Sequence, residues 1–151
     1  KSIIDDIFKT AKNNSCIINY PEDVAVGKSM DDKAIIKNLN EVTNDDIILD
    51  IGPKTISKIK NIIENSETIL WNGPAGYFEN PNFANGCFEI AKKIIEKNKD
   101  NRIYSVAGGG DTIAALNQMK VINNFNFVST AGGAFLEYLE GKELPGIKAL
   151  N

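Results

Sequence analysis

The sequence predicts an α/β fold in which a parallel sheet carries helices on both faces, as in a Rossmann-like three-layer sandwich. Short, nearly continuous apolar runs alternate along the chain with longer segments of helical periodicity. This alternation is typical of parallel sheets that are buried on both sides. Two of the apolar runs also end in glycine-rich turns that lead directly into helical segments. The 151 residues are enough for one domain with its own core.

The N-terminal third is predicted to contain one helix and short strands. Residues 3–11 place their apolar side chains on one helical stripe, and residues 16–20 form an apolar strand that ends at Pro21. Residues 23–26 either extend this strand or form a neighbouring one, and residues 29–41 are predicted to be a polar surface segment. Residues 27–29 (GKS) resemble the end of a P-loop, but Glu22 stands where that motif requires its first glycine. We therefore reject a P-loop.

The remaining strands and helices alternate in order. Residues 47–51 and 68–71 are predicted to be buried strands, and between them Gly52 and Pro53 begin a helix, because proline is tolerated in a first helical turn. Residues 83–97 form an amphipathic helix in this interpretation. Its inward residues are Phe88, Ala91, Ile94 and Ile95, and its outward residues are Lys92, Lys93 and Lys97. Residues 103–106 and 127–130 are the last two predicted strands.

The composition excludes several classes of function. The formal net charge of −3 disfavours a surface that binds nucleic acid, and the absence of histidine excludes histidine catalysis and histidine metal ligands. No apolar run approaches the length of a membrane span, and no signal peptide is visible. Cys16 and Cys87 fall in apolar segments, so we expect two buried, reduced thiols and a cytoplasmic protein.

The first glycine-rich turn lies within residues 102–112 (RIYSVAGGGDT). A strand that passes through glycine into a helix N-terminus can bind an anion, because the first N–H groups of a helix have no partner within it. Gly108, Gly109 and Gly110 would let a phosphate approach the backbone closely. Asp111 would then place a carboxylate beside that phosphate, which is how Mg²⁺ is commonly held. The alternative is a tight turn in which Asp111 only caps the helix.

A second turn of the same kind follows residues 127–130. The AGG triplet of residues 107–109 recurs at residues 131–133, and a helical segment again comes next. In a parallel sheet both turns lie along the carboxyl edge, where α/β proteins bind ligands. Two such turns on one edge can hold two parts of a polyphosphate.

A third segment, residues 71–79 (WNGPAGYFE), is too rich in turn-forming residues to be a strand. We expect Trp71 and Phe78 to pack in the core. Asn72 and Glu79 both follow a strand end, and a carboxylate such as Glu79 can accept hydrogen bonds from the hydroxyls of a ribose. A solvated loop glutamate is the alternative for Glu79 when that residue is considered alone.

These motifs together resemble the phosphoglycerate kinase family. The residues that carry the resemblance are DIGP (50–53), WNGPAGYFE (71–79), AGGGDT (107–112) and STAGGAFLEYLEGKELPG (129–146). They follow one another along the chain in the same order as in the family. The resemblance covers the later part of the C-terminal, nucleotide-binding domain. It therefore implies that residues 1–151 are a partial domain of a two-domain kinase, with a sheet incomplete at its N-terminal side. Residues 141–151 would be a surface tail that returns toward the absent N-terminal domain.

The resemblance implies reversible phosphoryl transfer between 1,3-bisphosphoglycerate and ADP, giving 3-phosphoglycerate and ATP, with Mg²⁺ as the metal. Asp111 would bind Mg²⁺, Glu79 the ribose, and Asn72 would lie near the phosphate chain. The glycines of the first turn and the residue after Asp111 would contact the phosphates; these are Gly108, Gly109, Gly110 and Thr112. Gly110, Gly132 and Gly133 would act on the transferring group. The full-length enzyme would be a monomer. Ala131 and Phe135 depart from many family members, which carry glycine and serine there.

Two other functions stay open at this point: a nucleotide-binding module without catalysis, and a purely structural α/β domain. The chain alone is predicted to be inactive. A phosphorylated, carboxylate-bearing acceptor calls for several cations, preferably arginines. Arg102 is the only arginine in the sequence, so the acceptor site is expected elsewhere.

Overall fold

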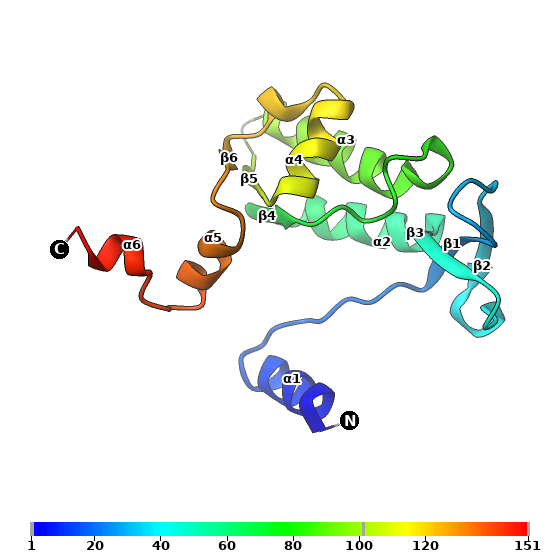
Figure 1. Ribbon diagram of the computed structural model, residues 1–151, viewed down its shortest axis with the longest axis horizontal. Coiled ribbons are helices and arrows are strands. Elements are labelled where there is room, and N and C mark those ends of the chain that lie inside the picture. Colours follow the sequence, from blue (N-terminus) through cyan, green and yellow to red (C-terminus); the bar gives the residue numbers. More distant parts are fainter. Residues whose placement is uncertain (1, 101, 151) are drawn as a thin grey trace.

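The computed structural model describes residues 2–100 and 102–150, and it contains two three-stranded sheets (Figure 1). The first is formed by β1 (Asp23–Gly27), β2 (Ile35–Asn38) and β3 (Ile47–Ile51) in the order β2-β1-β3. The second is formed by β4 (Thr68–Asn72), β5 (Tyr104–Gly108) and β6 (Phe127–Ser129) in the order β4-β5-β6. The main helices are α2 (Pro53–Glu64), α3 (Asn85–Lys99) and α4 (Gly110–Gln118).

The first sheet is antiparallel, with β1 paired to both β2 and β3. The prediction that residues 47–51 join one parallel sheet was therefore wrong, and so was the purely surface role expected of residues 29–41, which contain β2 and a 3₁₀ turn (Leu39–Glu41). The connection between β1 and β2, residues 28–34, is shorter than the dozen or more residues that a parallel crossover needs, so these strands pair as antiparallel neighbours. β3 pairs with the other edge of β1, also antiparallel, and so joins this sheet instead of the parallel one.

The second sheet is parallel, as predicted, and β4 and β6 both pair with β5. Helices α2, α3 and α4 pack against one face of it and enclose the main core. Trp71 and Phe78 lie in this core, as the sequence predicts. The other core residues are Ile63, Cys87, Ile90, Ala91, Ile94, Ala107, Ala115, Leu116 and Phe125.

The α/β class is confirmed, but among the described residues the helical layer on the second face is slight. Side chains alternate between the faces of a strand, and Leu70, Tyr104 and Phe127 on the second face are about half exposed. Among the described residues, α5 (Gly132–Leu139) reaches this face. The ring of Phe135 lies so near Gly108 that a Cβ built on that glycine would be 3.6 Å from it.

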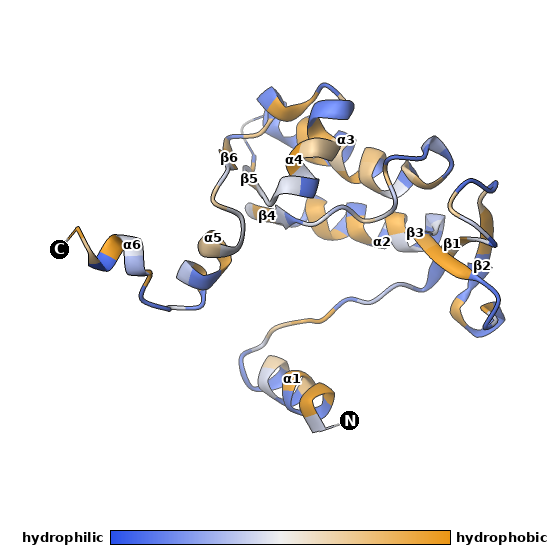
Figure 2. Cartoon of the chain, in the orientation of Figure 1, coloured by the Kyte–Doolittle hydropathy of each residue, from blue (hydrophilic) through white to orange (hydrophobic). Residues whose placement is uncertain are grey.

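The N-terminal helix α1 (Ser2–Asn13) and the short α6 (Pro145–Lys148) lie away from the body of the molecule (Figure 1). The apolar stripe predicted on α1 is present but exposed, and it stands out in Figure 2. Residues 16–20 are extended without strand pairing and Cys16 is exposed, so two sequence predictions were wrong here. Among the described residues, no helix combines the length and hydropathy needed to cross a membrane.

The N-terminus of α2 is capped from a distant strand by Asp23. This buried carboxylate of β1 accepts hydrogen bonds from the backbone N–H groups of Lys54 and Thr55 at 3.0 and 2.8 Å, and from the Thr55 hydroxyl at 2.8 Å. Burial acts to raise the pKa of Asp23, but these hydrogen bonds together outweigh it and hold the pKa below its usual range. The carboxylate therefore stays charged at the positive end of the helix dipole.

The N-terminus of α3 is capped in a similar way by Asp50 of β3. Its buried carboxylate accepts a hydrogen bond from the Gly86 N–H at 2.8 Å, in the first turn of the helix. Here burial dominates and raises the pKa of Asp50. A Cβ at Gly76 or at Gly86 would lie 2.3 Å from the same carboxylate oxygen, so both positions require glycine. Asp50 thus joins three segments at one point.

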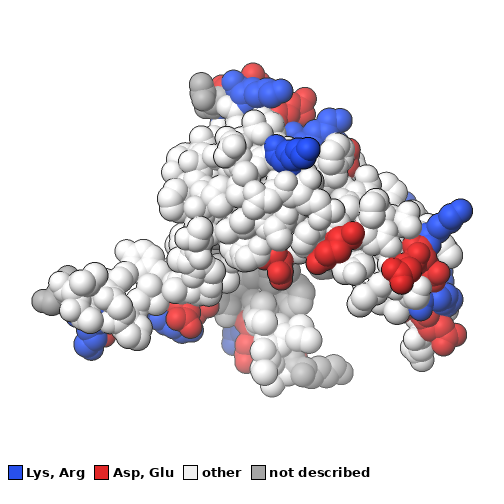
Figure 3. All heavy atoms as spheres, turned by 45° about the horizontal axis from the view of Figure 1, so that its top comes forward, with Lys and Arg blue, Asp and Glu red and all other residues white. Residues whose placement is uncertain are grey.

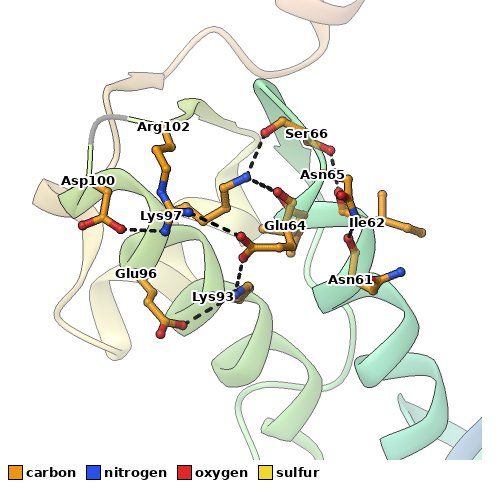
Figure 4. Close-up of polar contacts among 11 residues, drawn as sticks. Asn61, Ile62, Glu64, Asn65, Ser66, Lys93, Glu96, Lys97, Asp100 and Arg102 are labelled. Carbon is orange, nitrogen blue, oxygen red and sulfur yellow. Dashed lines mark hydrogen bonds and ion pairs between the residues drawn. The ribbon is translucent and has the colours of Figure 1, made fainter.

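The C-terminus of α2 is capped by Lys97 of α3 (Figure 4). Its ammonium donates hydrogen bonds to the carbonyls of Ile63 and Ser66, both at 3.1 Å, and to that of Glu64. Lys97 is only 4% exposed, so the prediction of an outward lysine was wrong. The last carbonyls of a helix have no partner within it, and a cation at that position satisfies them and complements the dipole.

The outward face of α3 shows one further correction. Phe88 was predicted to point inward, yet its side chain is 52% exposed, whereas Ile94 is fully buried.

Acidic and basic side chains lie next to one another at the rim of the face shown in Figure 3, and the middle of that face is mostly uncharged.

Replacing Lys97 should destabilise the fold. In Lys97→Met the apolar stem is kept, but three carbonyls at the end of α2 lose their donor. Hydrogen bonds with a charged partner contribute about 1.5–3 kcal/mol, so we expect a loss of at least that order. The matched control is Lys92→Met, on the exposed side of the same helix, which should change stability by less than about 0.5 kcal/mol. Urea unfolding followed by the fluorescence of Trp71, the single tryptophan, measures both. Equal effects would show that the cap contributes little.

Candidate functional site

The carboxyl ends of the three parallel strands meet at one edge. In the register of the sheet Asn72 lies beside Gly108, and Gly108 lies beside Ser129. The segments that follow these residues are the loop of residues 73–79, the turn into α4 and the turn into α5. The sheet therefore brings all three sequence motifs to the same edge, which is where open α/β sheets bind ligands.

The turn into α4 is built around Gly109. This residue precedes the first residue of the helix and has a φ of 91°, a conformation that side chains other than glycine rarely adopt. A Cβ here would also lie 2.7 Å from the Asn72 amide oxygen. Gly110 differs, because nothing lies within 4 Å of a Cβ built on it. The space in front of the N-terminus of α4 is thus open.

Asp111 is exposed in the first turn of α4. The N-cap residue of the helix is Gly109, and Asp111 follows two residues later, within the first turn. Within residues 2–100 and 102–150, no three carboxylate, cysteine or histidine side chains gather as a ready-made metal site. A metal at Asp111 would have one protein carboxylate, and its remaining ligands would come from a bound anion or water.

Thr112 has a structural contact that the sequence did not predict. Its side chain is buried, and its hydroxyl oxygen accepts a hydrogen bond from the Gly73 N–H at 2.7 Å. The Trp71 indole N–H donates to the Gly73 carbonyl, also at 2.7 Å. The start of the loop is therefore tied to the first turn of α4. Thr112 would therefore contact a ligand in front of the helix through its backbone N–H.

The rest of the loop is held by contacts from several elements. The Ala75 N–H donates to the Cys87 thiol at 3.1 Å, and the Tyr77 N–H donates to the Leu49 carbonyl at 2.7 Å. Burial raises the pKa of the Cys87 thiol, so it stays protonated. Cys87 is buried, as predicted. Its contact with the loop was missed, because nothing in the local sequence indicates which segment a helix start will touch.

Glu79 lies toward the other end of α4. The amide of Gln118, the last residue of that helix, donates to the Phe78 carbonyl at 3.2 Å, directly before Glu79. Thr112 contacts the start of the loop and Gln118 its end. At 1.5 Å per residue these two contacts are about 9 Å apart along the helix. Glu79 and the turn into α4 therefore flank an elongated site.

The turn into α5 is open to solvent. Gly132 has a φ of 49°, and nothing lies within 4 Å of a Cβ built on Gly132 or on Gly133. Packing among the described residues therefore does not require a glycine at Gly133. Its absent side chain leaves backbone N–H groups accessible at the N-terminus of α5. Phe135 of this helix lies near Gly108, so the two helix N-termini flank the end of β5.

Chemically, this edge can bind an anion. Two helix N-termini supply backbone donors and partial positive charge, and Asp111 supplies a hard oxygen ligand for a cation. Asn72 adds an amide beside Gly109.

Comparison with known proteins identifies a family with these features. The sequence model of the family "Phosphoglycerate kinase" matches residues 1–142. The chain is 45% identical over 152 residues to a phosphoglycerate kinase of Zymomonas mobilis, covering 99% of this chain and 38% of the relative. It is 42% identical to one of Wolbachia pipientis, covering 97% of this chain and 38% of the relative. The chain thus spans about 38% of the length of the curated relatives it matches.

Solved structures agree with the sequence comparison. The phosphoglycerate kinase of Coxiella burnetii superimposes with a TM-score of 0.88 at 38% identity, covering 97% of this chain and 37% of that one. The enzyme of Pyrococcus horikoshii gives a TM-score of 0.75 at 32% identity, covering 94% of this chain and 34% of that one.

The geometry of the first turn predicts different effects at neighbouring glycines. Gly109→Ala would force a side chain into a positive-φ conformation and against Asn72, so we expect a loss of about 1–3 kcal/mol. Gly110→Ala enters open space at the start of a helix, and we expect unchanged or slightly higher stability. Urea unfolding of the two variants, followed by Trp71 fluorescence, compares them directly. A Gly110→Ala variant as unstable as Gly109→Ala would contradict this description of the turn.

Proposed function

The chain belongs to the phosphoglycerate kinase family, and from that premise we propose that it supplies the magnesium–nucleotide half of a phosphoryl-transfer site. The reaction is the reversible transfer of a phosphoryl group between 1,3-bisphosphoglycerate and ADP, which gives 3-phosphoglycerate and ATP. The observation that carries this proposal is the open turn at Gly109 and Gly110, with the exposed Asp111 immediately after it. The remaining length of the relatives would supply the acceptor half.

In this proposal the phosphate chain of the nucleotide lies in front of α4. The backbone N–H groups of residues 109–112 donate to phosphate oxygens, with the Asn72 amide beside them. The glycines matter because a phosphate oxygen must come within hydrogen-bond distance of the backbone, and a side chain at Gly110 would occupy that space.

Mg²⁺ fits the donor set at Asp111. Mg²⁺ is commonly bound through one or two carboxylates together with phosphate oxygens and water, and Asp111 offers one exposed carboxylate at the place where those phosphates would lie. When bound, Mg²⁺ neutralises negative charge on the phosphate oxygens. The protein's own part is to hold the carboxylate at the start of α4.

Glu79 would bind the ribose at the other end of the site. Its position near the end of α4 matches a nucleotide that lies along this helix, with its phosphates at the N-terminus. The carboxylate can accept hydrogen bonds from ribose hydroxyls. Thus both the phosphate chain and the sugar would lie beside α4.

The turn into α5 would stabilise the transferring phosphoryl group. Gly132 and Gly133 present backbone N–H groups in open space at a second helix N-terminus, and Gly110 faces the group from the first. Phosphoryl transfer depends mainly on alignment and charge stabilisation, so fixed backbone donors are suited to this role.

The acceptor would bind outside the described residues. Arg102 forms ion pairs with Asp100 at 2.6 Å and with Glu64 at 3.6 Å. It precedes the first residue of β5, whereas the glycine turn follows the last one, so Arg102 lies at the opposite edge of the sheet. A cytoplasmic location and a monomeric full-length enzyme stay predictions from the sequence.

The role of Asp111 can be tested in a full-length kinase that carries this chain. We expect Asp111→Asn to weaken Mg-ADP binding by about a hundredfold, on the order of 3 kcal/mol, because the phosphates lose charge compensation. Binding of metal-free ADP should change far less. Calorimetric titration with and without Mg²⁺ measures both affinities. Equal losses in the two titrations would remove the metal from this proposal.

The division of the site between two parts of the protein predicts that these 151 residues do not catalyse transfer alone. We expect weak Mg-nucleotide binding at most, because one half of the site cannot align both reactants or exclude water. The test is a coupled assay for ADP formation from ATP that depends on 3-phosphoglycerate, with the full-length enzyme as control. Clear turnover by the chain would place the acceptor site within it, and an inactive full-length enzyme would overturn the proposed activity.

A further inference from the structure

We infer that α4 sets the length of the nucleotide site, because its last residue, Gln118, positions Glu79 for the ribose while its first turn takes the phosphates. The inference rests on the proposed function and adds to it a positioning residue for sugar recognition. Gln118 would not touch the nucleotide itself. It would act through the backbone of the loop.

Glu79 is free to be positioned by its backbone. It is exposed, and its carboxylate has no hydrogen bond or ion pair with the described residues. An exposed glutamate normally samples many orientations, and ordering it on binding costs conformational entropy. A carboxylate that must meet two ribose hydroxyls therefore benefits from a backbone that is already held in place.

Both neighbours of Glu79 are held by long-range contacts. The Phe78 ring is buried in the main core, and its carbonyl accepts the hydrogen bond from Gln118 at 3.2 Å. The Asn80 side chain donates to the Met30 carbonyl at 2.6 Å and accepts from the Asn82 N–H at 2.9 Å. Glu79 is thus the exposed residue between two anchored ones.

The contact from Gln118 acts directly on the orientation of Glu79. The Phe78 carbonyl and the Glu79 N–H belong to one planar peptide unit. Holding this plane fixes the starting point of the Glu79 backbone and restrains the direction of its Cα–Cβ bond. No other donor among the described residues contacts the Phe78 carbonyl.

Gln118 also lies on the helix whose N-terminus forms the proposed phosphate site. The first turn of α4 is tied to Gly73 through Thr112, and its last residue is tied to Phe78. A rigid helix keeps these two contacts about 9 Å apart along its axis. The phosphate and ribose subsites are therefore joined through one element.

The test compares ligands that contain different parts of the nucleotide. In a full-length kinase carrying this chain, calorimetry gives the affinities for Mg-ADP, Mg-2′-deoxy-ADP and Mg-pyrophosphate. The variants are Gln118→Ala, which removes the donor, and Gln118→Lys, which keeps a donor of similar reach. Asn117→Ala, at the neighbouring exposed position, is the matched control, and Glu79→Ala is the reference for a lost ribose contact.

We expect Gln118→Ala to bind Mg-ADP about three- to tenfold more weakly, the loss of about one hydrogen bond. Its affinity for Mg-2′-deoxy-ADP should fall less and its affinity for Mg-pyrophosphate should stay unchanged, so that the preference for ADP over the deoxynucleotide shrinks. Gln118→Lys should restore that preference, and Asn117→Ala should retain it.

Three outcomes would overturn the inference. If Glu79→Ala abolishes the preference for ADP while Gln118→Ala keeps it, Gln118 does not position Glu79, and the proposed function stands. If Gln118→Ala weakens Mg-pyrophosphate binding as much as Mg-ADP binding, Gln118 supports the whole helix instead of the sugar site. If the unaltered kinase itself shows no preference for ADP over 2′-deoxy-ADP, the proposed contact between Glu79 and the ribose is wrong, and this inference is then wrong as well.

Discussion

The structure depends on two buried carboxylates, Asp23 and Asp50, that hold helix N-termini from neighbouring strands. Each belongs to the antiparallel sheet, and each accepts hydrogen bonds from the first turn of a helix that packs on the parallel sheet. A buried charge is tolerated only when it is well hydrogen-bonded, so these contacts fix where α2 and α3 begin. They join two sheets between which no strands pair in the described part of the chain.

These contacts also hold the loop that carries part of the candidate site. Asp50 lies against Gly76, in the middle of the loop that carries Asn72 and Glu79 at its ends. That loop has no regular secondary structure, and its N–H groups are paired instead with Thr112, Cys87 and the Leu49 carbonyl. Asp111 and Glu79, the proposed ligands of the metal and the ribose, are exposed, whereas Thr112, Cys87 and Asp50, which hold the loop and the turn, are buried. A site of this kind needs little reorganisation when its ligand binds.

Local sequence was sufficient where the structure follows from short-range chemistry. The glycine turn before Asp111, the proline at the start of α2, the parallel pairing of β4, β5 and β6, and the burial of Trp71 were all predicted. Predictions from local sequence failed where a side chain can lie either in solvent or against another segment of the protein. Lys97 was assigned to solvent because lysine usually lies there, yet its ammonium finds three carbonyls at the end of α2. Phe88 followed the helical period of α3 and is nonetheless exposed.

The sequence by itself determined the α/β class, the glycine turns and the residue types that suit a phosphate and a metal, because these follow from periodicity, backbone freedom and charge. Only the tertiary structure decided which segments meet. The antiparallel pairing of β1 with β3, the caps from Asp23 and Lys97, and the contact between Gln118 and Phe78 all join residues 20 or more positions apart. Such contacts depend on how helices and sheets pack against one another, and no local pattern of residues encodes that arrangement.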